Sequence, residues 1–243
     1  MFRFKQFSVK NDGSAFKVGT DAVLLGATAS LPYGSGLKIL DAGTGTGIIA
    51  LMSAQRLWDS GVQDFRITGI DSDAAAAREA GENFAASPWS GHMEALNLSL
   101  SELETSLSGP GIYDLIISNP PYFENSLLNP DPKRRTARHA EADGLSWRTL
   151  MDFSAKFLVP GGCLAMILPV EASPCAANGL ILKRMVEIRS TASKPVSRLI
   201  VEYKKPGAEG PVDTTVKEEL TVLENGSYSR QYLSLTKDFH LFG

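Results

Sequence analysis

The hydrophobic pattern of this chain alternates between short apolar runs and longer segments with apolar residues at helical spacing. Short runs that are apolar on both faces are typical of buried parallel strands. Four such runs occur in the first half, at residues 37–40, 66–70, 92–99 and 113–117. Helical spacing occurs at residues 48–57, 74–86 and 146–158. This alternation predicts an α/β fold with a mostly parallel sheet.

The second half of the chain continues the pattern and then changes it. After a predicted strand at 163–168, we interpret 180–185 as the end of a helix. Residues 186–192 and 198–203 predict two strands joined through Lys194-Pro195, which is a terminal antiparallel hairpin. A short strand is expected at 219–223 and a last helix at 229–236.

The first 36 residues precede the predicted sheet. Phe4, Phe7 and Val9 alternate with polar residues, which predicts a short strand or hairpin with its turn at 11–13. A helix should follow from residue 22 to about residue 30, capped by Thr20 or Asp21. We therefore expect residues 1–36 to form an N-terminal cap that packs on residues 37–243, within a single globular domain.

Chemistry is concentrated where the predicted strand at 113–117 ends. Asn119, Pro120, Pro121 and Tyr122 follow it, and both prolines stop the strand and favour extended backbone before them. This arch places one amide side chain, one carbonyl and one aromatic ring at the carboxyl end of a strand, where α/β sheets bind ligands. Two acceptors and a stacking plane suit an amino group on a planar ring such as adenine. Asn-Pro-Pro by itself is also a common turn.

A glycine-rich turn between the strand at 37–40 and the helix at 48–57 predicts a cofactor site. Asp41 precedes Gly43, Gly45 and Gly47, and such glycines let the backbone approach a ligand closely. A dinucleotide motif of the form Gly-x-Gly-x-x-Gly would require glycine at Ile48, so a nicotinamide oxidoreductase is disfavoured.

The strand at 66–70 ends at Asp71, an acid placed to bind both hydroxyls of a ribose. Asp73 is the expected N-cap of the following helix, and Ile70 or Ser72 would border an adenine ring. After the third strand, Ser99, or alternatively Asn97, occupies the position expected to face the adenine amino group.

Charge and composition restrict the function classes further. The net charge is −3, but Lys133, Arg134, Arg135 and Arg138 follow the arch closely and predict a phosphate-binding lid over residues 123–143. A second basic set comprises Lys183, Arg184, Arg189, Lys194, Arg198, Lys204 and Lys205. We expect it to be either an RNA surface or an ordinary solvated face.

The two cysteines and three histidines have no metal-ligand spacing, so no metal site is expected. No apolar run is long enough to span a membrane, and we therefore expect a cytoplasmic protein.

Several of these motifs together resemble one known family. They are Phe4-x-x-Phe7, Lys17-Val18-Gly19-Thr20-Asp21 with Leu24-Leu25-Gly26, Asn119-Pro120-Pro121-Tyr122, Thr136-Ala137-Arg138 and Tyr228-Ser229-x-x-Tyr232. The set is similar to that of the bacterial valine-tRNA adenine-N6 methyltransferases. These are class I enzymes that use S-adenosylmethionine (SAM) and have a seven-stranded Rossmann-like fold. The Asn-Pro-Pro-Tyr motif alone is shared with other amino-group methyltransferases.

The resemblance implies methylation of adenosine 37, next to the anticodon of valine tRNA, by a methyltransferase domain at 37–243. The expected catalytic residues are Asn119, Pro120 and Tyr122. The expected SAM-binding residues are Lys17, Thr20, Asp41, Gly43, Gly45, Gly47, Asp71, Ser72, Ser99 and Asn119. Alternatives that remain open are methylation of another amino group in rRNA, methylation of a glutamine amide in a release factor, and a SAM-dependent RNA-binding factor with weak chemistry.

Overall fold

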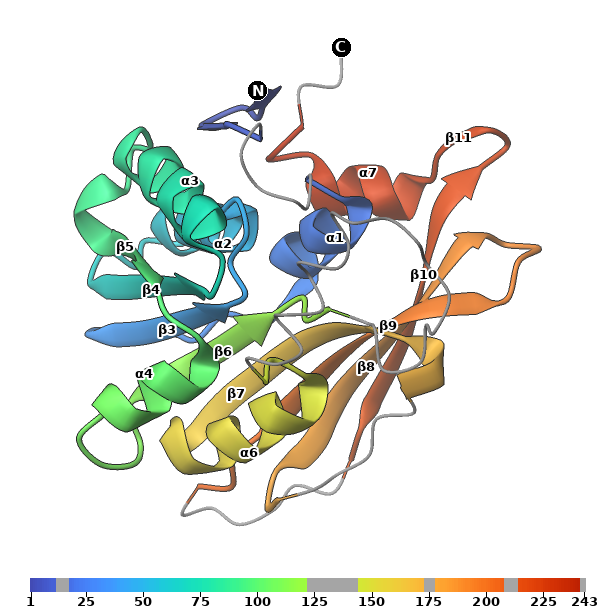
Figure 1. Cartoon of the computed structure of the whole chain (residues 1–243). Helices are drawn as coiled ribbons and strands as arrows, with labels where there is room; N and C mark the ends of the chain where they lie inside the picture. The colour runs from blue at the N-terminus through green and yellow to red at the C-terminus, as the bar shows by residue number, and fades with distance from the viewer. Residues whose placement is uncertain (12–17, 122–143, 173–177, 208–213, 241–243) are drawn as a thin grey trace, which may run out of the picture.

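The computed structural model describes residues 1–11, 18–121, 144–172, 178–207 and 214–240. A nine-stranded sheet runs through the molecule in the order β11-β10-β8-β9-β7-β6-β3-β4-β5 (Figure 1). Its central strands are β3 (Leu37–Ala42), β4 (Phe65–Asp71), β5 (Met93–Asn97), β6 (Tyr113–Ser118) and β7 (Leu158–Pro169). All neighbours among these five strands pair in parallel, which confirms the predicted α/β class.

The chain changes direction across the sheet between β3 and β6. From β3 it adds β4 and β5 on one side, and then returns to add β6 and β7 on the other. The carboxyl ends of β3 and β6 therefore lie next to each other at one edge of the sheet, and the chain leaves them in opposite directions. In open α/β sheets such a switch point is where ligands bind.

The predicted terminal hairpin is confirmed, but it is longer than expected. Strands β8 (Ile181–Thr191) and β9 (Val196–Lys204) pair antiparallel, and β9 also pairs antiparallel with β7. The helix predicted to end at 180–185 is wrong, because Ile181–Met185 belong to β8. Most side chains in this part of β8 are half-buried on both faces, so the sequence has no alternating pattern there.

Two further strands widen the sheet beyond the seven of the family resemblance, and the first of them confirms the strand predicted at 219–223. Strand β10 (Val216–Glu224) pairs in parallel with β8, and β11 (Ser227–Tyr228) forms a short hairpin with β10. The helix predicted at 229–236 is confirmed as α7 (Arg230–Thr236), and the Ser229 side chain caps it by accepting from the Tyr232 amide.

Helices cover both faces of the sheet (Figure 1). One face carries α1 (Thr20–Thr28), α2 (Ile48–Asp59), α3 (Ala74–Ala85) and α7, whose apolar side chains pack with the N-terminal aromatic residues. The other face carries α4 (Leu100–Ser106) and α6 (Trp147–Phe157), which form a second apolar cluster with β6 and β7. Three short segments complete the described elements: η1 (Ser90–His92), η2 (Val170–Ala172) and the hairpin β1 (Phe2–Arg3) with β2 (Ser8–Val9).

Helix starts show where local sequence signals were sufficient. Asp73 caps α3 as predicted, since its side chain accepts from the Ala75 amide. In contrast, α1 begins at Thr20 after Gly19, and no side-chain hydrogen bond caps it, so the predicted cap at Thr20 or Asp21 is wrong. The N-terminal hairpin turns at residues 4–7, where the Phe4 amide donates to the Phe7 carbonyl, and the predicted turn at 11–13 lies largely outside the described residues.

Candidate active site

The carboxyl ends of four parallel strands meet at one edge of the sheet and carry most of the predicted site residues. Asp41 lies near the end of β3, Asp71 ends β4, Asn97 ends β5, and Asn119 follows β6. Neighbouring parallel strands lie roughly 5 Å apart, so the site crosses about 15 Å of this edge. The tertiary structure thus brings together residues that are 78 positions apart in the sequence.

The glycine turn is fastened to the end of β4 by backbone hydrogen bonds. The amides of Gly43 and Thr44 both donate to the carbonyl of Ile70, at 2.9 and 2.8 Å. Gly43, Gly45 and Gly47 have φ values of 72°, 55° and 80°, in the left-handed region that side-chain-bearing residues rarely adopt. The backbone conformation of the turn therefore favours glycine at these three positions.

The three glycines differ in what lies beside them. A Cβ atom at Gly43 would come within 2.7 Å of the Leu145 side chain, and one at Gly47 within 2.4 Å of the Phe84 ring. A Cβ atom at Gly45 would meet nothing within 4 Å among the residues that the structure describes. Gly45 therefore borders the open side of the turn, where a ligand can approach the backbone.

A buried amide also supports the turn, and the sequence analysis did not single it out. Asn83 is 2% exposed and donates from Nδ2 to the carbonyls of Thr46 and Lys10. The Lys10 amide donates to the Asn83 side-chain oxygen in return, at 2.8 Å. Asn83 is a polar residue on the packed face of the alanine-rich helix α3, and this feature of the sequence could have indicated its role.

Asp71 is half-buried at the end of β4 and accepts one backbone hydrogen bond on each carboxylate oxygen. The donors are the Gly45 amide at 2.9 Å and the Asp73 amide at 3.0 Å. Burial raises the pKa of this carboxyl, and these two amides oppose the shift. Each carboxylate oxygen can accept a second hydrogen bond, so a vicinal diol such as that of ribose can bind without breaking these two.

Asp41 is fully buried beneath the turn. Its Oδ2 accepts from the Thr44 hydroxyl at 2.7 Å, whereas Oδ1 has no hydrogen bond in the described part of the chain. Burial raises the pKa of this carboxyl to about 7, and the Thr44 hydroxyl and the nearby Ala50 amide in α2 oppose the shift. Buried acceptors without partners are rare in proteins. This oxygen is not accessible to solvent, so its charge would act on a bound ammonium group through the turn or through an intervening water molecule.

Asn97 at the end of β5 and Ser99 just after it form hydrogen bonds within the protein that the sequence analysis did not predict. Asn97 donates from Nδ2 to the carbonyls of Asp71 and Ser72, at 2.9 and 3.0 Å, and so holds the loop after β4. Ser99 caps the short helix α4 in a reciprocal capping box with Glu102. The Ser-x-x-Glu spacing was the signal for this cap. The Ser99 hydroxyl is thus already bonded within the protein, and its contact with adenine stays a prediction.

The arch after β6 is anchored to the floor of the glycine turn. The buried Ser118 hydroxyl donates to the carbonyl of Ala42, the last residue of β3, at 2.7 Å. Asn119 follows and is half-buried, and Pro120 is buried. This hydrogen bond holds the predicted target-base residues next to the predicted cofactor turn.

Several predicted site residues lie outside the described residues. They are Lys17, Tyr122, Lys133, Arg134, Arg135 and Arg138. Thr20 is described and is the first residue of α1, and Ser72 is exposed in the loop after β4.

Two arginines of the second basic set are paired with acids within the protein. Arg184 lies 2.7 Å from Glu202 and 2.8 Å from Glu218, and hydrogen bonds with these carboxylates raise its pKa. Arg198 lies 2.8 Å from Asp21. These side chains are therefore bonded to acids rather than arranged as an open surface for phosphates.

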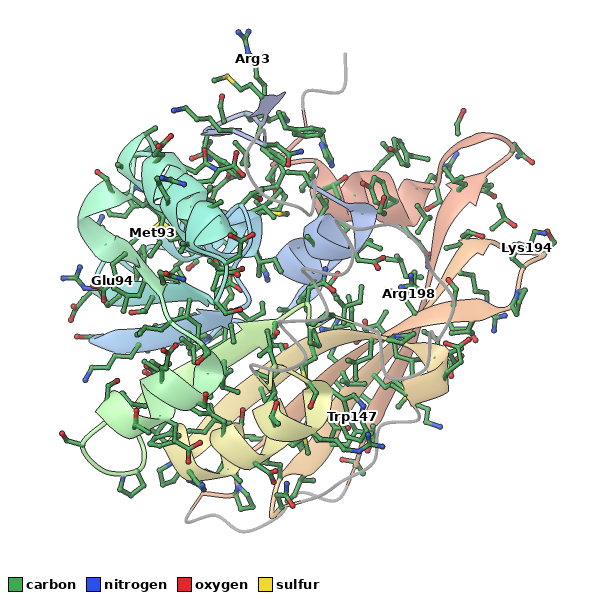
Figure 2. The ribbon with its side chains drawn as sticks, viewed as in Figure 1. Arg3, Met93, Glu94, Trp147, Lys194 and Arg198 are labelled. Carbon is green, nitrogen blue, oxygen red and sulfur yellow. The ribbon has the colours of Figure 1, made fainter. Side chains whose placement is uncertain are left out.

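The remaining members of that set are dispersed. Arg189 lies 3.9 Å from Glu187, and Lys205 donates to the Leu158 carbonyl at 2.9 Å. Figure 2 shows Lys194 at the far tip of the β8–β9 hairpin. The interpretation of this set as structural or solvated is favoured over an RNA surface.

In the described ranges, no three His, Cys, Asp or Glu side chains gather closely enough to bind a metal ion. None of their helices combines the length and the apolar character needed to cross a membrane.

Comparison with known proteins agrees with this geometry. The family model of the methyltransferase small domain matches residues 18–172, which include the glycine turn, Asp71 and the arch. Two solved structures share the fold at low sequence identity. One, described as a predicted O-methyltransferase from Agrobacterium tumefaciens, has a TM-score of 0.62 and 18% identity, covering 90% of this chain and 96% of its own. The other, described as a class I SAM-dependent methyltransferase from Listeria monocytogenes, has a TM-score of 0.57 and 17% identity, covering 89% and 65%.

The fold and the site thus define a class I SAM-dependent methyltransferase. Curated relatives from Parabacteroides distasonis and Photobacterium profundum are 40% and 37% identical to this chain. Each match covers 99% of this chain, with 97% and 98% of the relatives' own lengths. Both are named tRNA1(Val) (adenine(37)-N6)-methyltransferase, and the chain belongs to this family.

The described residues fit SAM as the methyl donor. The turn is open at Gly45, which leaves room for a ligand against the backbone. The Asp71 carboxylate retains capacity for a ribose diol, and the buried carboxylate of Asp41 places beneath the turn a negative charge that suits the ammonium of the methionine part, through water. An acid at this position would repel a pyrophosphate, so the site suits SAM better than a dinucleotide.

Proposed function

We propose that this protein transfers the methyl group of SAM to N6 of an adenosine in tRNA, and specifically to adenosine 37 of valine tRNA. The single observation that carries the proposal is the arch. Its Asn119 and Pro120 are fastened beside the cofactor turn by the hydrogen bond from Ser118 to Ala42. The printed names of the relatives support the same substrate and position.

The cofactor half of the site holds SAM and orients it. Asp71 binds the ribose hydroxyls, Asp41 interacts with the methionine ammonium, and Gly45 lets the ligand lie against the backbone. Further contacts are proposed for Lys17, Thr20, Gly43, Gly47, Ser72, Ser99 and Asn119. SAM supplies an already activated methyl group. The main task of the protein is therefore to align the acceptor nitrogen with that group.

The target-base half holds the amino group and stabilises its charge. The Asn119 amide oxygen and the Pro120 carbonyl accept hydrogen bonds from the adenine amino group. As the nitrogen attacks, it becomes positively charged, and acceptors aimed at it stabilise that charge. Tyr122 stacks on the extruded base, which contributes about 1–3 kcal/mol. The proton leaves the cationic product readily, so no strong general base is needed.

The basic lid binds the RNA backbone around the target base. Lys133, Arg134, Arg135 and Arg138 follow the arch in sequence, and they contact phosphates next to the extruded nucleotide. The ion pairs of Arg184 and Arg198 support this assignment, because they withdraw two arginines from the competing basic set. Such a substrate implies a cytoplasmic protein, since tRNA is modified there.

Identification of the methylated product tests the proposal. Unmodified valine tRNA is incubated with the protein and methyl-labelled SAM, digested to nucleosides and analysed by mass spectrometry. We expect labelled N6-methyladenosine, and none from a transcript in which adenosine 37 is replaced by guanosine. Label in another tRNA or in rRNA would exclude the proposed substrate. Label in a protein co-substrate would instead indicate glutamine-amide methylation.

The role of the lid is tested by the salt dependence of tRNA binding. The double variant Arg134→Ala and Arg135→Ala should bind tRNA more weakly and with a shallower slope against log salt concentration, because fewer counterions are released. SAM affinity should not change. A matched control is Lys38→Ala with Lys204→Ala, since both lysines are exposed at the opposite edge of the sheet. Equal slopes for the two double variants would show that the lid does not bind RNA.

A further inference from the structure

We propose that Asp21 and Arg198 are positioning residues of the active site, which together hold the first turn of α1 where Thr20 meets the cofactor. This inference rests on the proposed function for the role of Thr20. The ion pair itself joins two residues that are 177 positions apart in the sequence.

Strand register places this ion pair at the same edge of the sheet as the active site. Arg198 is the partner of Pro169 in β7, and Met166 of β7 is the partner of Ser118 in β6. Arg198 thus lies three residues beyond the level of Ser118, two strands away from the arch. Strand spacing and rise put it roughly 10 Å to the side of β6 and about 10 Å further along the strand direction. The start of α1 is consequently held at the carboxyl edge, and Arg198 is labelled in Figure 2.

The geometry of the pair is specific. Nε of Arg198 donates to Oδ2 of Asp21 at 2.8 Å, and an NH1 hydrogen of Arg198 bonds to the carbonyl of Ser197 in its own strand. The second bond restricts the guanidinium to one orientation. The Arg198 and Asp21 side chains remain 34% and 28% exposed, so solvent screens their attraction. A pair of this kind contributes little to global stability but can define a position.

The opposite end of α1 is held much more firmly. Arg184 donates to the Thr28 carbonyl at 3.0 Å, and the buried Glu202 accepts from the Ser30 amide at 2.9 Å. Arg56 donates to the carbonyls of Gly26 and Ala29, at 2.9 and 2.8 Å. Gly26 also packs closely on α2, since a Cβ atom there would come within 2.8 Å of the Met52 sulfur. This end stays in place when the Asp21–Arg198 pair is broken.

The first turn of α1 lacks the usual capping contact. Gly19 is the N-cap residue, and in the described chain no side chain caps the helix there. Among the described residues, Asp21 connects this turn to the sheet through its ion pair with Arg198. Ala22 and Val23 in the same turn are buried in the core, so the pair controls the exposed residues at the start of the helix. Loss of the pair lets Gly19 and Thr20 shift away from the cofactor.

A double-mutant cycle on SAM affinity tests the proposal. Asp21→Asn and Arg198→Gln should each weaken SAM binding a few-fold by calorimetry, with kcat at saturating SAM changed much less. The double variant should bind no more weakly than either single variant, because both remove the same contact. Arg198→Lys should restore part of the affinity. Glu218→Gln is the matched control, since it weakens the ion pairing of Arg184 at the far end of α1 and should leave SAM affinity unchanged.

The possible results separate positioning from folding and from the proposed function. Binding is measured well below the melting temperature of every variant, so partial unfolding does not imitate a loss of affinity. Wild-type affinity in the single variants, or fully additive losses in the double variant, would overturn the inference. Calorimetry with SAM alone does not depend on the methyl acceptor. If mass spectrometry finds a different acceptor, the proposed function fails while the positioning role can still stand.

Discussion

The two halves of the active site are built by different means. In the cofactor half, β3, β4 and β5 end in loops that hydrogen bond to one another: Gly45 to Asp71, and Asn97 to the backbone after β4. In the target-base half, two prolines restrict the backbone covalently, and Ser118 ties the arch to β3. A single substitution in the cofactor half is thus expected to disturb several contacts, whereas one in the arch should affect chemistry with little effect on folding.

The sharpest test of this difference is Asn119→Ala. Removing one acceptor from the target nitrogen should lower kcat on the order of 10²–10³-fold, because the interaction serves the transition state. The dissociation constant for SAM should stay within a few-fold of wild type. Single-turnover kinetics and calorimetry on the same sample measure both quantities. Retention of turnover within a few-fold would reduce the arch to a structural turn.

Two glycine variants separate folding from ligand access within the cofactor half. Gly45→Ala should still fold, with a loss of stability on the order of 1 kcal/mol because residue 45 has a left-handed backbone. Its SAM affinity should fall about tenfold or more, because the added methyl group occupies the open side of the turn. Gly47→Ala should lower the melting temperature strongly, because its Cβ atom would overlap the Phe84 ring. Thermal melting and calorimetry compare the two. Equal effects on stability would contradict the assigned difference between these glycines.

Asp71→Asn tests the ribose contact. The amide retains the size of the carboxylate, and its single oxygen can keep only one of the two backbone hydrogen bonds with Gly45 and Asp73. We expect SAM affinity to fall about tenfold, since charge-assisted bonds to the hydroxyls are lost. The substitution should reduce the affinity for a SAM analogue without the 2′-hydroxyl by less than it reduces the affinity for SAM. The same discrimination for both ligands would remove Asp71 from the ribose site.

The pH dependence of SAM binding tests Asp41, with the smallest expected effect on affinity. Because its pKa in the folded protein is about 7, the carboxyl loses its proton as pH rises from 6 to 8. Interaction with the methionine ammonium should then strengthen SAM binding a few-fold over this interval. The Asp41→Asn variant should show no such rise. A flat wild-type profile would argue against this contact.

The same residue makes a prediction for stability without ligand. The folded-state pKa of about 7 lies above the ordinary value of 3.8, so the native state binds the proton more tightly than the unfolded state. The contribution of Asp41 to the free energy of unfolding therefore falls as pH rises from about 4 to 7, and stays low above 7. Asp41→Asn should be more stable than wild type at pH 8, by about 4 kcal/mol at most, with little difference near pH 4. Denaturant unfolding at both pH values measures this.

Local sequence was sufficient where neighbouring residues decide the conformation. The glycine turn, the helix cap at Asp73 and the strand end at Asn119-Pro120 are dictated by residues within a few positions of one another. Ile48 disfavoured a dinucleotide site on the same local basis. The motif combination supplied the substrate class, which no single motif did.

Only the tertiary structure decided the features that depend on distant pairs. Sequence placed Lys183 to Lys205 together as a basic set, but the sheet brings Glu202, Glu218 and Asp21 to its arginines. Residues 181–185 became a strand because β9 pairs along this segment and β10 pairs with Arg184 and Met185 on the other side. Asp21 was expected to cap a helix locally, and instead reaches an arginine 177 residues away. Periodicity and spacing report local preference, whereas hydrogen bonds and ion pairs between strands arise only once the chain is folded.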